Sequence, residues 1–283
     1  RQHPIDPKRL KNIPVMYLYA TSDGSMWLGY RSVLAKYDTN GQLVKEYPIR
    51  NEHGGASISG FCESRNHEII ISVWNGRVYH LDKEKDEFIP YPDKMRSRNP
   101  TVMVQDNEQD YFWLATWGDG VVRFDPSAPG DSMFVYSEIP VNAAGEEDGL
   151  ILSLAQDDKL GYIWLTTGHD FMALQIQPDR TLKQLKFPAG LLPVNHMLVE
   201  VLKGKECLWV SAFDRPSFIL HLMDNITKDY ALPALADRVN RSPAIMALCD
   251  DGDGMMWMMQ ERTGLAPVSY THLRAHETLS DLV

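Results

Sequence analysis

The sequence predicts an all-β fold, a β-propeller of about six four-stranded blades, from three observations. A tryptophan-centred segment recurs along the chain at intervals of 43 to 51 residues. Each interval holds about four short segments rich in Val, Ile, Tyr, Phe and Trp, separated by Gly, Asp and Asn. Helical periodicity over ten or more residues is absent before residue 266. Four short strands per repeat of this length are typical of a propeller blade.

The recurring segment, called the frame below, consists of a polar turn, an apolar residue, a Trp and a second apolar residue. Ile70 replaces the Trp in one copy. We expect the frame on the second strand of each blade, where its large side chain packs between neighbouring blades instead of stacking on a ligand. The frame positions are Trp27, Ile70, Trp113, Trp164, Trp209 and Trp257.

The flanks of the frame supply the other strands in order. An apolar run precedes each turn, as in VMYLYA, ISGFCE and TVMVQD. A third segment often closes on Asp, as in LAKYD, RVYHLD and VVRFD, and a fourth follows in several copies, as in QLVKEYPI, EFIPYP and MFVYSEIP. After a lead-in over 1–12, the expected blades cover 13–55, 56–98, 99–148, 149–194, 195–240 and, in part, 241–265.

Both ends of the sequence depart from the repeat. Six repeats lead us to expect an incomplete ring, a fragment of a seven-bladed propeller. Residues 266–283 break the pattern and resemble translated sequencing-adapter read-through, so we expect a non-native tail there. The alternative is a natural helical tail.

Composition excludes several classes of function. The formal net charge of −10 argues against binding of nucleic acid or of an anionic membrane surface. Apolar runs stay well below the roughly 20 residues of a membrane helix. Cys62, Cys207 and Cys249 are too scattered for a disulfide scaffold or a metal site. The segment DDGDG at 250–254 lacks the distal ligands of a calcium loop. We therefore expect neither a metal nor a cofactor.

The frame, with its Gly-containing turn and closing Asp, resembles the two-component regulator propeller repeat. The best copies are SDGSMWLGYRSVLAKYD and QDYFWLATWGDGVVRFDP, and the resemblance covers about 13–265. It departs at Ile70 and in DFMALQIQP and FILHLMD, where the closing Arg/Tyr–Asp is lost. In that family the repeats form the extracytoplasmic sensor of hybrid histidine kinases, typical of gut Bacteroidetes.

The resemblance implies a function and a set of partners. It implies a periplasmic sensor that detects oligosaccharides to control glycan-utilisation genes. It also implies a neighbouring propeller and a β-sandwich domain in the parent chain, and a homodimer of the parent. The kinase part is not in this sequence, so we expect this chain itself not to be an enzyme.

Propeller geometry places a ligand site on the face where second strands end and first strands begin, because binding residues concentrate on loops of a rigid scaffold. Trp74 and Trp117 are the two tryptophans outside the frame, and both fall in these loops. An indole ring can stack on a sugar while polar neighbours bind its hydroxyls. The expected ligand-binding residues are Trp74, Asn75, Arg77, Trp117, Asp119, His169, Asp170, Asp214 and Arg215.

Other interpretations of this face remain open. Loop tryptophans can pack under neighbouring loops, and Arg usually pairs with a nearby Asp. Six arginines on the face could instead hold an acidic sugar. Asp119, Asp170 and Asp214 come from different blades and could converge in a lyase or hydrolase acting on glycans. We assign no catalytic residue, and a protein-interaction scaffold is the third possibility.

Overall fold

The structure, a computed structural model of the 283-residue chain, describes the following residues: 17–30, 32–51, 54–74, 77–92, 95, 99–157, 160–186, 198–203, 207–212, 218–221, 245–250, 255–260 and 264–269. The chain divides into two compact units, Arg1–Tyr136 and Ser137–Val283.

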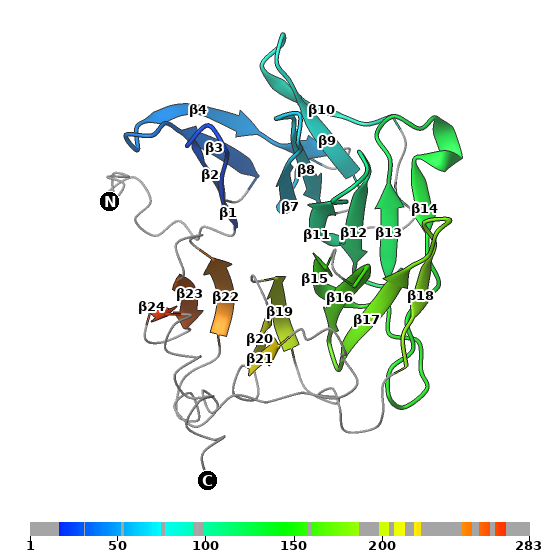
Figure 1. The fold of residues 1–283 in the computed structure, drawn as a ribbon. Helices are drawn as coiled ribbons and strands as arrows, with labels where there is room; N and C mark the ends of the chain where they lie inside the picture. Colours follow the sequence, from blue (N-terminus) through cyan, green and yellow to red (C-terminus); the bar gives the residue numbers. More distant parts are fainter. Residues whose placement is uncertain are drawn as a thin grey trace. The chain divides into compact units, whose positions relative to one another are not determined.

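The first unit contains three four-stranded antiparallel sheets, each an up-and-down meander (Figure 1). The first sheet is β1 (Tyr17–Ala20), β2 (Met26–Tyr30), β3 (Val33–Tyr37) and β4 (Leu43–Pro48). The second is β7 (Ile58–Glu63), β8 (Ile69–Val73), β9 (Arg77–Asp82) and β10 (Glu87–Pro90), and the third is β11 (Pro100–Gln105), β12 (Phe112–Thr116), β13 (Val121–Phe124) and β14 (Phe134–Tyr136). A short hairpin, β5 (Arg50–Asn51) and β6 (Gly54–Gly55), separates the first two sheets in sequence, and a 3-10 turn, η1 (Gly130–Ser132), precedes β14.

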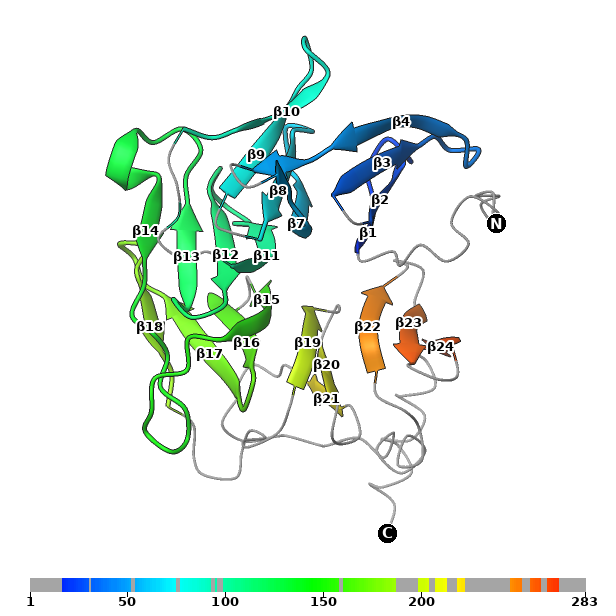
Figure 2. The same ribbon diagram turned by 180° about the vertical axis from the view of Figure 1, so that it is seen from behind.

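The second unit repeats this pattern (Figure 2). One sheet has four strands, β15 (Ile151–Asp157), β16 (Tyr162–Thr167), β17 (Phe171–Ile176) and β18 (Leu182–Gln184). Two further sheets show three described strands each: β19 (Leu198–Lys203), β20 (Cys207–Ala212) and β21 (Phe218–His221), then β22 (Ile245–Asp250), β23 (Met255–Gln260) and β24 (Gly264–Ser269). β24 pairs with β23 throughout, so the boundary expected after Leu265 falls inside a strand.

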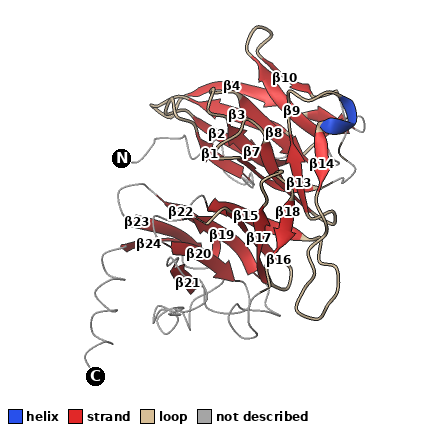
Figure 3. Ribbon diagram, turned by 45° about the vertical axis from the view of Figure 1, so that its right-hand side comes forward, coloured by secondary structure: helices blue, strands red, loops and turns tan. Residues whose placement is uncertain are grey.

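The first strands of successive sheets lie side by side within each unit. β1 is next to β7 and β7 next to β11 in the first unit, and β15 is next to β19 and β19 next to β22 in the second. Strands make up nearly all the regular structure (Figure 3). The described residues contain no helix long and apolar enough to cross a membrane. Meander sheets stacked through their first strands are propeller blades, so the predicted fold is confirmed.

The frame side chains form the blade-to-blade core, as the repeat predicts. Trp27, Trp113 and Trp164 are at most 1% exposed. The ring of Trp27 lies 5.7 Å from that of Phe61 on the next blade. Ile70 packs with apolar residues of the third blade, including Phe112, Leu114 and Val122. A large buried apolar side chain on β2, β8, β12 and β16 therefore packs in the core, whereas Trp257 on β23 is partly buried and the Trp209 side chain lies outside the described residues.

A β-bulge recurs at the start of the first strand of the blade. The pairing with the second strand shifts register between Ile58 and Gly60, and again between Pro100 and Val102. The same shift occurs in β15, β19 and β22. A bulge bends its strand and increases the local twist. These bulges lie at the end of the blade where the second strand finishes. The sequence predicts the ligand site on this face.

Candidate functional site

Trp74 and Trp117 occupy the same position in two adjacent blades. Each directly follows a second strand, Trp74 after β8 and Trp117 after β12. The backbone N–H of Trp74 donates to the carbonyl of Ser57 at 3.0 Å, and that of Trp117 to the carbonyl of Asn99 at 2.8 Å. Both acceptors immediately precede the bulged first strand of their own blade. The blade ends therefore fix the backbone from which each indole projects.

The two indole rings meet. Their centroids are 5.6 Å apart and their planes are inclined by 62°, an edge-to-face contact. Trp117 is 52% exposed, whereas Trp74 is partly buried. Among the exposed large apolar side chains of the described residues, Trp117 is the aromatic one. A solvent-facing indole supported by a second indole is an apolar surface available to a ligand.

Polar groups beside the pair differ in their availability. Asp119 follows Trp117 by two residues, is partly buried, and donates its backbone N–H to the hydroxyl of Thr116 at 3.1 Å. The Arg77 guanidinium donates to the backbone carbonyl of Tyr91 at 3.1 Å, at the end of β10. Arg77 thus binds the segment that follows the outer strand of its own blade.

His169 and Asp170 lie in the second unit and have different surroundings. Asp170 is 2% exposed, and its carboxylate accepts the backbone N–H of Ala143 at 2.7 Å. It therefore anchors the loop before β15. The His169 side chain is 66% exposed, and its Nδ1 lies 3.3 Å from Oδ2 of the buried Asp148. Of this adjacent pair, only His169 faces solvent.

Three of the expected ligand-binding residues, Asn75, Asp214 and Arg215, lie outside the described residues. The expected convergence of Asp119, Asp170 and Asp214 stays a prediction for that reason. Within the described segments, no group of three or more His, Cys, Asp or Glu side chains is placed to hold a metal ion.

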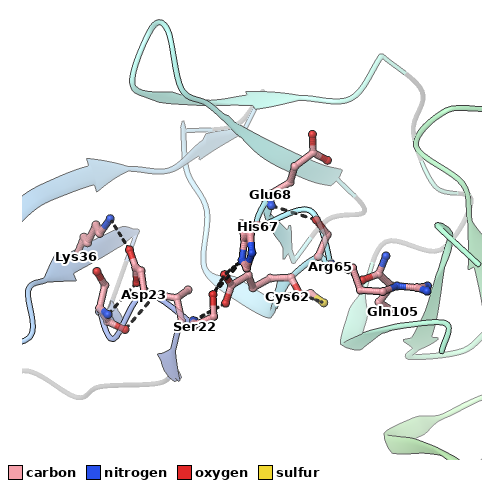
Figure 4. A network of polar contacts seen from close by, with 12 residues as sticks. Ser22, Asp23, Lys36, Cys62, Arg65, His67, Glu68 and Gln105 are labelled. Atoms are coloured by element: carbon pink, nitrogen blue, oxygen red, sulfur yellow. Dashed lines mark hydrogen bonds and ion pairs between the residues drawn. The ribbon is translucent and has the colours of Figure 1, made fainter. Parts of the chain in front are cut away.

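A polar network at the opposite end of the blades was not expected from the sequence (Figure 4). Glu63, the last residue of β7, accepts the backbone N–H of Ser22 at 2.7 Å and its hydroxyl at 2.5 Å, across the boundary between two blades. One blade further on, the backbone N–H of Arg65 donates to Oε1 of Gln105 at 2.7 Å. Glu63 and Gln105 end the first strands of their blades, so an acceptor at this position fastens each blade to the previous one.

Ser22, His67 and Glu63 have the composition of a hydrolytic triad but not its connectivity. Nδ1 of His67 lies 2.9 Å from the Ser22 hydroxyl and 2.9 Å from Oε1 of Glu63. A triad needs the serine on one imidazole nitrogen and the carboxylate on the other. Burial raises the pKa of Glu63, but the hydrogen bonds from Ser22 and His67 outweigh it and lower the pKa overall. The network is a structural clamp.

Asp106 and Asp148 are further residues that the sequence reasoning missed. Asp106 is fully buried, and its Oδ2 accepts Nε1–H of Trp113 at 2.9 Å. An Asp seven residues before the frame Trp also occurs at positions 157 and 250, a recurrence that marks the position but does not by itself identify the hydrogen bond. Asp148 carries no such signal, because its partner His169 is 21 residues away.

In comparisons with known proteins, the chain is similar to solved structures. No protein-family profile matches the chain, and no curated protein matches it. The virginiamycin B lyase of Staphylococcus aureus superposes with a TM-score of 0.66 at 18% identity, over 90% of this chain and 80% of the lyase. PorZ of the type-IX secretion system of Porphyromonas gingivalis gives 0.71 at 14% identity, over 90% of this chain and 38% of PorZ.

The extracellular domain of BT4673 from B. thetaiotaomicron, which is described as a hybrid two-component system, superposes on this chain with a TM-score of 0.63 at 15% identity. The match covers 89% of this chain and 33% of that one, so this chain spans about a third of the BT4673 extracellular domain. At such identities the likeness shows a shared propeller fold.

Proposed function

We propose that this chain is the ligand-sensing propeller of an extracytoplasmic two-component sensor and that it binds an oligosaccharide on the Trp74–Trp117 pair. The exposure of Trp117 against a second, backbone-anchored indole is the observation that carries the proposal. An indole face stacks on the apolar face of a pyranose, and nearby carboxylate and backbone groups bind hydroxyls. The fold shared with the BT4673 extracellular domain supports the sensor role.

The proposed signal passes through the rest of the parent protein. In this proposal the parent is a membrane-anchored hybrid histidine kinase with its sensor on the periplasmic side. A ligand shifts the sensor between two arrangements only by as much as its affinity for them differs. The neighbouring propeller, the β-sandwich domain and the second copy of the parent are the partners whose contacts would change, and glycan-utilisation genes are the output.

A glycan array followed by calorimetry of the chain tests the proposal. Trp117→Ala should lower the affinity for the best glycan by about 30-fold, the effect of losing a tryptophan that anchors a ligand. Trp117→Phe should retain part of the affinity, because it keeps a ring. Val44→Ala, at a 58% exposed apolar side chain on β4, is the matched control and should bind normally. Failure to bind any glycan, or full affinity in Trp117→Ala, would refute the proposal.

A lyase is the second candidate, favoured by His169. The carboxylate of Asp148 contacts its Nδ1 and leaves Nε2 toward solvent, which is how a general base is oriented. A histidine-to-alanine variant of the S. aureus virginiamycin B lyase is catalytically inactive, so a histidine matters in that neighbour. Mass spectrometry after long incubation tests whether the chain is a lyase. The substrates are quinupristin, the ligand of that lyase structure, and the glycans that bind on the array. Product from the natural chain but not from His169→Ala would establish an enzyme.

A further inference from the structure

The angle between the two indole rings, and not only their exposure, constrains what can bind. A 62° inclination at 5.6 Å makes neither a flat floor of two coplanar rings nor a clamp of two parallel ones. The edge-to-face contact restrains both side chains, and the hydrogen bonds from Trp74 to Ser57 and from Trp117 to Asn99 restrain both backbones. The angle is therefore set by the arrangement of two successive blade ends.

Successive sugars of a chain present their apolar faces in directions fixed by the glycosidic linkage. A flat chain, such as a β-1,4-linked glucan, needs coplanar rings beneath it to stack two sugars at once. A chain that bends, such as an α-1,4-linked glucan, or one that branches, presents the second face turned away from the first. Only the second kind can stack one sugar on the exposed face of Trp117 and reach Trp74 with its neighbour.

Among the described residues, the charged side chains next to the pair favour a neutral chain. Asp119 is two residues from Trp117, and in the described residues its side chain forms no hydrogen bond or ion pair. The Arg77 guanidinium binds the carbonyl oxygens of Tyr91 and, at 3.5 Å, Pro92. A sulfated or uronic sugar held close to Asp119 would be repelled by a carboxylate of like charge.

We propose that the Trp74–Trp117 pair selects neutral oligosaccharides that bend or branch between the two stacked sugars over flat chains of the same sugar. This inference rests on the proposed function and names the shape of its ligand. Trp117 provides most of the affinity, because it is the exposed ring. Trp74 provides the preference for shape, because the inclination of its ring sets the direction in which the second sugar must face.

The experiment uses the whole chain and pairs of glycans that differ in linkage alone, with maltotetraose and cellotetraose as the glucose pair and equivalent pairs of other sugars from the array. Calorimetry should give at least tenfold tighter binding to the bent member of every pair that binds. Trp74→Ala should reduce this ratio to about one, because binding of the bent member weakens more than binding of the flat member. Trp74→Phe, which keeps a ring and guards against misfolding of the alanine variant, should retain an intermediate ratio.

The outcomes separate this inference from the proposed function. Equal or tighter binding of the flat members, or an unchanged ratio in Trp74→Ala, would overturn the shape preference and leave the sensor intact. Preferred binding of sulfated or uronic glycans would overturn the inference that the ligand is neutral. An array on which no glycan binds would overturn the proposed function, and the shape preference with it.

Discussion

At the residue scale, the same residue type has two roles that depend on its place in the blade. Trp113 lies within a second strand, is fully buried and donates its indole N–H to Asp106. Trp117 lies one residue beyond the end of the same strand and is 52% exposed. Leaving a buried indole N–H without an acceptor is unfavourable, and Asp106 supplies the acceptor for Trp113. The Asp–Trp pair is therefore a unit of stability, whereas the indole of Trp117 contributes little to the core.

Asp106→Ala should lower the free energy of unfolding by about 3 kcal/mol, because it leaves the buried Trp113 N–H without its acceptor and removes the cap on the backbone N–H groups of Glu108 and Gln109. Urea denaturation measures the change. Asp125→Ala, which removes a comparable turn cap on Ser127 without a buried indole, should cost less than about 1 kcal/mol. Equal losses in the two variants would contradict this role for the buried pair.

At the element scale, the innermost strand of the blade is where blades approach most closely. Gly60 lies just after the bulge of β7 and faces Ser72 of β8 and Met103 of the next blade. A Cβ at Gly60 would lie 2.5 Å from Oγ of Ser72, well inside contact distance. Glycine is favoured there because Ser72 on the second strand leaves no room for a Cβ, while Met103 of the next blade lies at ordinary contact distance.

Gly60→Ala should destabilise the chain by about 1–3 kcal/mol through overpacking. Ser72→Ala alone should cost about 1 kcal/mol, since it removes the buried contact at 3.2 Å between the hydroxyls of Ser59 and Ser72. In the double variant Gly60→Ala/Ser72→Ala, the Ser72 hydroxyl that would collide with the new Cβ is absent. The loss of stability in the double variant should therefore be smaller than the sum of the losses in the two single variants. Strict additivity of the two changes in a double-mutant cycle would exclude the collision as the cause.

At the scale of the whole molecule, surface carboxylates link the turns of the first unit and should make its stability depend on pH. Hydrogen bonds from Thr21 and Ser25 lower the pKa of Asp23 to about 2. The pKa of Glu63 is also lowered, despite its burial, by Ser22 and His67. A carboxylate whose pKa is lower in the folded chain stabilises it above the unfolded pKa, near 4, and this stabilisation is lost as the pH falls toward the folded value.

The melting temperature should therefore be constant from about pH 7 to 5 and decline steadily below pH 4. Asp23→Asn keeps the side-chain oxygen that accepts the Ser25 N–H but cannot titrate, so its melting temperature should decline less than that of the natural chain between pH 4 and 2. Differential scanning calorimetry across this range checks both. A melting temperature that rises on acidification, or identical acid curves for the two chains, would show that these groups do not link stability to pH.

The sequence by itself determined the fold class, the order of the strands and the burial of Trp27, Trp113 and Trp164. It could do so because each repeat forms the same strands and keeps a large apolar residue at the position that packs in the core. It also identified Trp74 and Trp117, since two tryptophans outside the repeat need another explanation. The tertiary structure alone decided that these rings touch at 62°, that Asp170 is buried, and that Glu63 and Gln105 join neighbouring blades. Those facts depend on distances between residues some 27 to 43 positions apart, and such distances are set by blade packing and bulges, not by local residue preferences.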